Sequence, residues 1–208
     1  MRDNPTNNQP TGQIAVGKRS KLRFVIPIVL LLSAAIIACS SADNGSSSAN
    51  SFDDGSSPNS GGLAPDFPIT IFQGRDVVGG KEINFSDLLG QRPIVLNFWA
   101  GLCPPCRAEL PDLQAFHEKF QDHVLMLGID LGQPFGLGSQ QDAKDLLNEL
   151  GITYPTGAPD DSSIIKNYEI FGIPATVFID GEGKIFETWS SIVTSEILEE
   201  KTLEMLNQ

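Results

Sequence analysis

Two cysteines spaced three residues apart are the side chains of this sequence best suited to chemistry. Cys103 and Cys106 lie where an apolar, β-rich run at 94–99 gives way to a helical pattern. A Cys-x-x-Cys on the first turn of a helix brings the two sulfur atoms close enough to bond, and the helix N-terminus stabilises a thiolate on the first cysteine. Because a thiolate is the nucleophile of disulfide exchange, the pattern predicts that Cys103 attacks and Cys106 resolves.

The same pair has two other interpretations. Half of a zinc site would need two further ligands, and the remaining Cys and His residues are Cys39, His117 and His123, of which Cys39 has another assignment below. A purely structural disulfide would close a very short loop and would restrain the unfolded chain little. Reversible redox chemistry is therefore favoured, and we expect neither a metal nor a cofactor other than the Cys103–Cys106 disulfide.

The elements that must position the pair follow an α/β pattern. Strands are predicted at 69–72, 82–85, 94–99, 124–129, 174–179 and 184–189, and helices from just after Cys103 to about Phe120 and at 140–150, 163–168 and 194–206. Pro111 is expected to kink the first of these helices. The order predicts an α/β sandwich with a central mixed β-sheet flanked by helices, and the first two strands form an N-terminal β-hairpin extension.

The N-terminal part of the chain has a different character. Basic residues at 18–23 precede an apolar run at 24–38, which is shorter than the roughly 20 residues of a membrane-spanning helix. A basic flank before a short apolar core is the layout of a secretory signal. The run ends Ile-Ile-Ala-Cys39, which resembles the lipobox of bacterial lipoproteins. We therefore expect 1–38 to be a signal peptide and Cys39 to be lipidated, anchoring the protein to the outer side of the bacterial cell membrane.

A linker follows the predicted anchor. Residues 39–62 are rich in Ser, Gly, Asn and Asp and predict a flexible tether to a folded domain at 63–208. For the signal peptide and Cys39, the alternative interpretation is an uncleaved anchor, or an ordinary signal with an incidental cysteine. Cleavage before Cys39 would leave 9 Lys and Arg against 25 Asp and Glu, a net charge of −16 in place of −12. This balance argues against nucleic acid as a partner and against electrostatic adhesion to anionic lipid.

Several motifs resemble a known family, and they occur in the family's order. The segment Asn97-Phe-Trp-Ala, the Cys-Pro-Pro-Cys and the later Gly172-Ile-Pro-Ala-Thr are similar to the thioredoxin fold. The opening Ala64-Pro-Asp-Phe and the Cys106-x-x-Glu-x-Pro pattern resemble, more narrowly, the TlpA/ResA group, which is related to the AhpC/TSA proteins. Members of that group are membrane-tethered, extracytoplasmic thiol–disulfide oxidoreductases. The resemblance covers nearly all of 63–208 and implies a thioredoxin-like fold with protein thiols and disulfides as substrates.

The resemblance also implies roles for individual residues. Pro174 would be a cis-proline that faces the cysteine pair, and the backbone of Ile173 would pair with an incoming peptide. Asn97 occupies the place where thioredoxin has a buried, proton-transferring aspartate, and an asparagine cannot do this at neutral pH. Glu109 matches an active-site glutamate of the ResA-like proteins and is the expected replacement. The alternative for Glu109 is a solvated residue on the helix surface.

Four residues next to the cysteines are expected to shape docking and redox potential. Leu102 stands where relatives usually carry tryptophan, and Gly101 stands where threonine is common. Leucine keeps the site apolar but removes a flat aromatic wall, so partner docking should differ from that of relatives. Pro104 and Pro105, which separate the two cysteines, are expected to tune the reduction potential.

These features support several functions. The leading hypothesis is a reductase of extracytoplasmic protein disulfides, for example of apocytochrome c, with electrons supplied by a membrane protein of the CcdA/DsbD type. The nearest alternative is an oxidase that introduces disulfides, which would have a stabilised reduced form. A copper-delivery protein of similar fold would use Cys-x3-Cys and a distal histidine, but no histidine follows His123. A non-catalytic lipoprotein is a further alternative.

Overall fold

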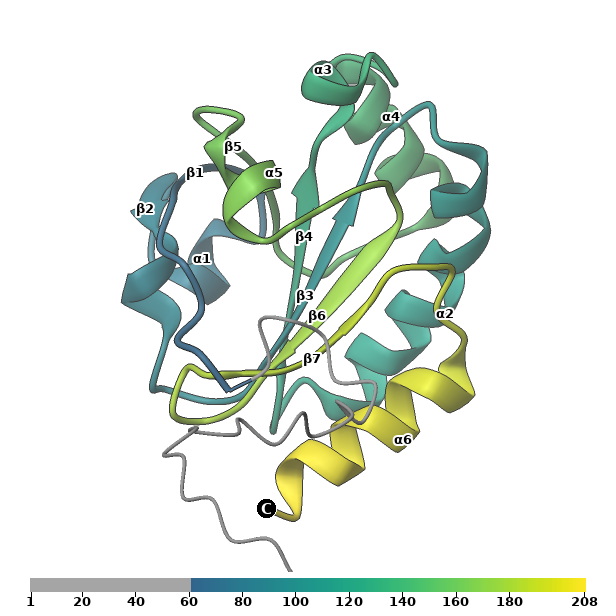
Figure 1. Cartoon of the computed structure of the whole chain (residues 1–208). Coiled ribbons are helices and arrows are strands. Elements are labelled where there is room, and N and C mark those ends of the chain that lie inside the picture. Colours follow the sequence, from purple (N-terminus) through teal and green to yellow (C-terminus); the bar gives the residue numbers. More distant parts are fainter. Residues whose placement is uncertain (1–60) are drawn as a thin grey trace, which may run out of the picture. The chain divides into compact units, whose positions relative to one another are not determined.

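The computed structural model describes residues 61–208. The predicted signal peptide, the lipidation site Cys39 and most of the predicted tether lie outside the described residues. The described part is built on a seven-stranded sheet with the strand order β2-β1-β5-β4-β3-β6-β7 (Figure 1). The strands are β1 (Pro68–Gln73), β2 (Glu82–Asn84), β3 (Ile94–Trp99), β4 (Leu125–Asp130), β5 (Thr156–Pro159), β6 (Ala175–Ile179) and β7 (Ile185–Trp189).

The pairing of the strands makes the sheet mixed. β3 is parallel to β4 and antiparallel to β6, and β4 is parallel to β5. β1 pairs antiparallel with both β2 and β5, so the N-terminal hairpin is part of the same sheet. The predicted α/β fold with a central mixed sheet and an N-terminal hairpin is therefore confirmed.

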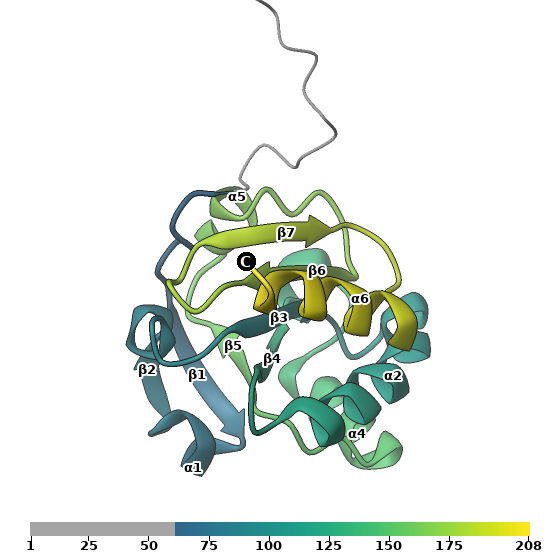
Figure 2. The same ribbon diagram turned by 90° about the horizontal axis from the view of Figure 1, so that it is seen from below.

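Helices cover both faces of this sheet. They are α1 (Arg75–Val78), the 3-10 helix η1 (Phe85–Leu88), α2 (Pro104–Phe120), α3 (Gly132–Phe135), α4 (Gln140–Leu150), α5 (Ser163–Asn167) and α6 (Ser195–Leu206). Figures 1 and 2 show α2 and α6 side by side on one face, where both contribute to a core that also contains α4. The other face packs against α5 and the hairpin.

Strand β3 is buried on both faces and leads directly to the cysteine pair. Its six residues are all buried, and they alternate between the two cores. Leu96 and Phe98 face the hairpin side, while Val95 and Trp99 face α2. This alternation follows from the period of two of a β-strand. The continuous apolar run that predicted a central strand is thus explained by burial on both sides, and it fixes the position of the loop that follows.

The Cys-Pro-Pro-Cys sequence forms the start of α2. Cys103 is the N-cap in extended conformation, and Pro104 and Pro105 occupy the first helical positions. Proline is tolerated there because the N–H groups of the first turn have no partner within the helix. The helix continues through Pro111 to Phe120, the end that the sequence predicted.

Four elements were not predicted, and several predicted boundaries differ from the structure by one residue. The unpredicted elements are α1, η1, α3 and β5. Phe85 begins η1 and does not end β2 as predicted. Strand β5, with the sequence Thr-Gly-Ala-Pro, has one β-branched residue and no aromatic residue, and it contains Gly and Pro, which are depleted in strands. It is a strand because β1 and β4 pair with it on either side, a long-range effect.

Among the described residues, backbone contacts with the domain extend to two residues before its predicted start. The N–H of Gly61 donates to the carbonyl of Ile185 at 2.7 Å, and the N–H of Ile185 donates to the carbonyl of Gly62 at 2.8 Å. These contacts start two residues before Leu63, where the folded domain was predicted to begin. Within 61–208, no helix has the length and apolar character needed to cross a membrane.

Gly101 allows the cysteine loop to lie directly on α4. A Cβ placed at Gly101 would lie 2.5 Å from the backbone nitrogen of Ala143 and 2.6 Å from the carbonyl carbon of Asp142. Backbone atoms of a helix cannot yield as a flexible side chain can, so Gly101→Ala should lower the free energy of unfolding by roughly 1–3 kcal/mol. Chemical denaturation of the oxidised protein measures this.

The matched control is Gly80→Ala. A Cβ at Gly80 would meet only ordinary contacts, 3.7 Å from Cγ2 of Ile83 and 3.9 Å from the carbonyl of Glu82. The control should change stability by less than about 0.5 kcal/mol. Equal stabilities of the two variants would contradict the close packing of the cysteine loop on α4.

Candidate active site

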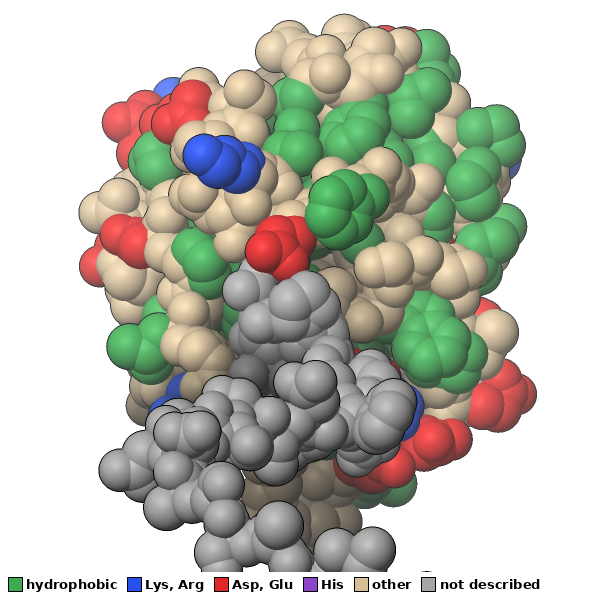
Figure 3. Space-filling view, in the orientation of Figure 1, with side chains coloured by type: hydrophobic (Ala, Val, Ile, Leu, Met, Phe, Trp, Pro, Cys, Tyr) green, Lys and Arg blue, Asp and Glu red, His purple; other side chains and the backbone are tan. Residues whose placement is uncertain are grey.

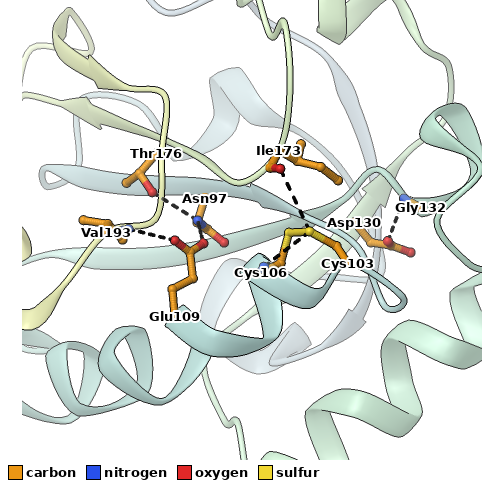
Figure 4. The surroundings of a disulfide bond; sticks show 9 residues. All are labelled: Asn97, Cys103, Cys106, Glu109, Asp130, Gly132, Ile173, Thr176 and Val193. Atoms are coloured by element: carbon orange, nitrogen blue, oxygen red, sulfur yellow. Dashed lines mark hydrogen bonds between the residues drawn. A yellow bond between two sulfur atoms is a disulfide. The ribbon is translucent and has the colours of Figure 1, made fainter.

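Cys103 and Cys106 are joined by a disulfide bond at the start of α2 (Figure 4). The backbone N–H of Cys106 donates to the Sγ of Cys103 at 3.3 Å. This N–H belongs to the first turn of the helix, where N–H groups otherwise lack partners. In the reduced protein, the same donor and the helix N-terminus would both stabilise a negative charge on the sulfur of Cys103.

Both cysteines are buried in the oxidised form. Their exposed fractions are 2% for Cys103 and 0% for Cys106. The two side chains belong to the core that contains Trp99, which is itself fully buried beneath the site. Leu102 and Pro104 flank Cys103 and are exposed, so they form the outer surface next to the disulfide.

The loop before β6 lies against Cys103. The Ile173–Pro174 peptide bond is cis, which confirms the prediction for Pro174. The carbonyl oxygen of Ile173 is 4.0 Å from the Sγ of Cys103 (Figure 4). The pairing of β6 with β3 holds this loop beside the disulfide, although about 70 residues separate the two segments in sequence. The backbone of Ile173 therefore borders the place where a partner sulfur would approach.

Glu109 is buried beneath the cysteine pair and connects three segments. One carboxylate oxygen, Oε1, accepts from the Nδ2 of Asn97 at 2.8 Å, and Oε2 accepts from the N–H of Val193 at 2.9 Å (Figure 4). Asn97 also donates to the Oγ1 of Thr176 at 3.0 Å. The exposed fraction of Glu109 is 1%, so the alternative interpretation, a solvated helix residue, is wrong.

The buried position of Glu109 changes its acidity. Burial raises its pKa to about 7, and the nearby carboxylate of Asp112 adds to the rise. The hydrogen bonds from Val193 and Asn97 oppose this effect because they stabilise the charged form. A carboxyl group with a pKa near neutrality can both accept and release a proton at physiological pH. Glu109 thus has the chemistry expected of a proton carrier beside Cys106, one helical turn away.

The amide of Asn97 can adapt to either form of that carboxyl group. Its Oδ1 is buried and has no hydrogen-bond partner among the described residues. The oxygen and nitrogen of an amide are assigned from the surrounding hydrogen bonds. A neutral Glu109 could donate to Oδ1 after rotation of the amide, whereas an ionised Glu109 accepts from Nδ2 as observed. Asn97 cannot carry a proton itself, but its amide can form a hydrogen bond with either the neutral or the ionised form of Glu109.

A second buried carboxyl group near the disulfide was not predicted. Asp130 ends β4 with an exposed fraction of 4%, and its Oδ1 accepts from the N–H of Gly132 at 2.9 Å. Burial raises the pKa of Asp130 to about 6. The sequence signal was an acidic residue directly after an apolar strand, at the carboxyl edge of the sheet where ligands of α/β proteins bind.

The segment after β4 also packs on the cysteine loop. The N–H of Leu102 donates to the carbonyl of Leu137 at 2.8 Å, and a Cβ at Gly138 would lie 3.0 Å from the Cγ of Leu102. Another exposed apolar residue, Phe171, lies in the loop before the cis-proline and is 93% exposed. Figure 3 shows hydrophobic side chains gathered at the end of the molecule where α3 lies.

Three further residues named in the sequence analysis lie in α2 or just after it. Pro105 is half-buried on the first turn of α2. His123 is exposed, and His117 packs edge-on against the ring of Tyr154. Among residues 61–208, no three His, Cys, Asp or Glu side chains converge as metal ligands would.

Comparisons with known proteins agree with the resemblance seen in the motifs. The profile of the AhpC/TSA family matches residues 61–188. Thiol-disulfide oxidoreductase ResA of Oceanobacillus iheyensis is 28% identical over 200 residues, which cover 96% of this chain and 93% of that protein. Sporulation thiol-disulfide oxidoreductase A of Bacillus subtilis is 30% identical over 128 residues, 61% of this chain and 75% of the relative.

Solved structures agree on the fold. The crystal structure of StoA from Bacillus subtilis has a TM-score of 0.54 at 27% identity and covers 66% of this chain and 96% of its own. The thioredoxin domain of a thiol-disulfide oxidoreductase from Bacteroides vulgatus has a TM-score of 0.59 at 21% identity, covers 71% of this chain and 98% of its own, and supports the fold alone. The chain therefore belongs to the AhpC/TSA family, in the ResA-like group of thioredoxin-fold thiol–disulfide oxidoreductases.

Proposed function

We propose that this protein reduces disulfide bonds of partner proteins outside the cytoplasm, while a lipid on Cys39 holds it at the membrane. The observation that carries the proposal is the Cys103–Cys106 disulfide at a helix N-terminus, directly above the buried Glu109. A dithiol at this position combines a stabilised nucleophile with a nearby proton acceptor, and disulfide exchange requires both.

The proposed reaction proceeds in two exchanges. The thiolate of Cys103 attacks one sulfur of the partner's disulfide, a mixed disulfide forms, and the partner's other sulfur leaves as a thiolate. Cys106 then loses its proton and attacks the Sγ of Cys103, which releases the partner's remaining sulfur. Two electrons pass to the partner, which ends as a dithiol after taking up two protons, and the protein ends with the Cys103–Cys106 disulfide described above.

Glu109 is proposed as the acceptor of the proton from Cys106. The two residues lie three apart on α2 and therefore on the same face of the helix. The Cys106 side chain is fully buried in the disulfide form, so its sulfur atom is shielded from bulk water there. A carboxyl group whose pKa is about 7 can take this proton at neutral pH and release it later.

The proposed location outside the cytoplasm rests on the sequence before residue 61. The basic flank, the apolar run at 24–38 and Cys39 support export and lipidation, and 39–62 would give the domain reach from the membrane. Each reduction of a partner oxidises the cysteine pair, so a donor must regenerate it. A membrane protein of the CcdA/DsbD type is the proposed donor, and apocytochrome c is a proposed substrate.

One observation favours the opposite direction of electron flow. The N–H of Cys106 points at the Sγ of Cys103, and a stabilised thiolate makes the reduced form more stable, as in strong oxidants. The buried carboxyl groups of Glu109 and Asp130 act against this, because an ionised carboxylate destabilises a neighbouring thiolate. Introduction of disulfides is therefore the second candidate function.

The reduction potential of the cysteine pair separates the two directions. For a reductase we expect equilibration with dithiothreitol or glutathione buffers to give a potential near or below about −270 mV. A potential near −120 mV would establish an oxidase in its place.

The pH dependence of stability tests the buried state of Glu109. Its pKa is raised from 4.5 to about 7, so the folded protein holds this proton more tightly than the unfolded chain. The stability from the neutral carboxyl group is complete below pH 4.5 and is lost as the pH rises through 7, on the order of 3 kcal/mol in total. Glu109→Gln should remove this part of the slope in denaturation curves measured from pH 4 to 8.

The control for that measurement is Glu118→Gln, an exposed residue near the end of the same helix. It should keep the slope of the unmodified protein. A smaller fall remains in every variant, because burial also raises the pKa of Asp130, from 3.8 to about 6. An unchanged slope in the Glu109→Gln protein would show that ionisation of Glu109 does not lower the free energy of unfolding.

The proton-transfer role of Glu109 predicts a change in the kinetics. In the Glu109→Gln protein, the step in which Cys106 releases the partner should slow by at least about tenfold at pH 7, since a positioned base typically contributes more than that. The inflection near pH 7 in the rate of this step should also disappear. Single-turnover measurements that follow the decay of the mixed disulfide report both quantities. An unchanged pH profile, with Glu118→Gln as control, would exclude the role.

A further inference from the structure

A pocket of about 570 Å³ lies at the same end of the sheet as the disulfide. We call it the acidic pocket, because three carboxylates line it, those of Asp130, Asp160 and Asp161. Uncharged polar groups line it as well, and no lysine or arginine does so among the described residues. Its size falls in the range of ligand pockets, roughly 300–1,000 Å³.

Asp130 is the part of the acidic pocket that points to a ligand. Its side chain is nearly fully buried, with an exposed fraction of 4%. Oδ1 accepts from the N–H of Gly132, but no described residue donates to Oδ2. A buried carboxylate that lacks part of its hydrogen bonding is costly, and a charged donor entering the pocket would offset this cost. The second oxygen of Asp130 is therefore free to accept from a donor that enters the pocket.

The other two carboxylates are held in place at the rim. Oδ1 of Asp160 accepts from the Oγ1 of Thr70 at 2.9 Å, and Oδ1 of Asp161 accepts from the N–H of Ser163 at 2.7 Å. These contacts fix both side chains and leave a second oxygen of each for another donor. Figure 3 shows acidic side chains over the connection between β5 and α5, where these residues lie.

The spacing of the carboxylates selects the kind of cation. No group of three or more acidic, His or Cys side chains within 61–208 is close enough together to hold a metal ion. A lysine or arginine side chain has several N–H donors on a long apolar stem, so it can reach one buried carboxylate while passing others at the rim. The basic residue nearest along α4, Lys144, does not supply this cation, because its Nζ donates to Gln140 and it does not line the pocket.

The acidic pocket is connected to the disulfide by close backbone packing. A Cβ at Gly132, the residue that donates to Asp130, would lie 2.8 Å from the carbonyl of Gly138. Gly138 in turn packs on Leu102, the residue before Cys103. Figure 4 includes both Asp130 and Gly132 among the residues that surround the disulfide. A polypeptide that is bonded to Cys103 and extends over Leu102 would therefore reach the segment that borders the pocket.

We propose that the acidic pocket binds the lysine or arginine side chain of a protein substrate, from a position near the cysteine that reacts with Cys103. The inference rests on the proposed function, since it names the class of substrate that the same site takes. The net charge of the chain, −12, favours basic partners in the same way.

Two disulfide-containing peptides that differ only in one residue next to the cysteine, lysine against glutamine, test the proposal with the full chain in its reduced form. We expect kcat/KM for the lysine peptide to be about tenfold higher, the effect of one charge-assisted hydrogen bond. In Asp130→Asn the two peptides should react at equal rates, so that the preference for lysine is lost whatever the change in the rate common to both peptides. An asparagine keeps the acceptor for Gly132, so the fold should be preserved.

Two further variants make the result decisive. Asp160→Asn at the exposed rim should reduce the preference for lysine in part, and it does so even if Asp130→Asn fails to fold. Asp122→Asn, with the same change in net charge at the far end of α2, should keep the full preference. Equal rates for the two peptides with the unmodified protein, or a preference for lysine that Asp130→Asn leaves intact, would overturn the pocket proposal. Absence of exchange with either peptide would overturn the proposed function itself.

Discussion

The burial of one carboxyl group, that of Glu109, is the constraint on which the arrangement of this protein depends. A carboxyl group in a core must be hydrogen-bonded or neutral, and Glu109 meets this requirement with Asn97 from β3 and Val193 from the segment before α6. Asp112, also on α2, accepts from the N–H of Ser195 at 3.3 Å. Two acidic residues of α2 thus hold the start of α6: Glu109 binds the segment before this helix, and Asp112 binds its first residue. The hydrogen bond from Val193 to Glu109 therefore helps to position α6 and also affects the pKa of Glu109.

The chemistry of the site follows from opposing electrostatic effects within a small volume. The helix N-terminus and the N–H of Cys106 favour a thiolate on Cys103, and the buried carboxyl groups of Glu109 and Asp130 disfavour one. Because the carboxyl groups have pKa values of about 7 and about 6, their own protonation alters the balance near neutral pH. Thiol reactivity in this protein is therefore a property of the group of residues and not of the cysteines alone.

Local sequence signals predicted most of the fold and the centre of the site. The apolar runs of β3 and β4 and the Cys-Pro-Pro-Cys start of α2 carry their structure in neighbouring residues, and all three were predicted correctly. Strand β5 was missed because its formation depends on pairing with β1 and β4. Whether Glu109 is solvated or buried depends on Val193, which lies 84 residues away, so the sequence left both options open. Asp130 was missed although it directly follows an apolar run in the sequence.

The strand register shows that the disulfide and the junction with the preceding chain lie at opposite ends of the folded domain. The carbonyl of Ile185 accepts from the N–H of Gly61, and the N–H of Ile185 donates to the carbonyl of Gly62. In the sheet, Ile185 pairs with Ile179, which in turn pairs with Ile94 at the start of β3. The disulfide follows the other end of β3, five residue steps or about 17 Å along the strand. The preceding chain thus joins the body at the pole opposite to the disulfide. A force applied through that junction would therefore act on the end of the domain opposite to the cysteine pair and would leave that pair uncovered.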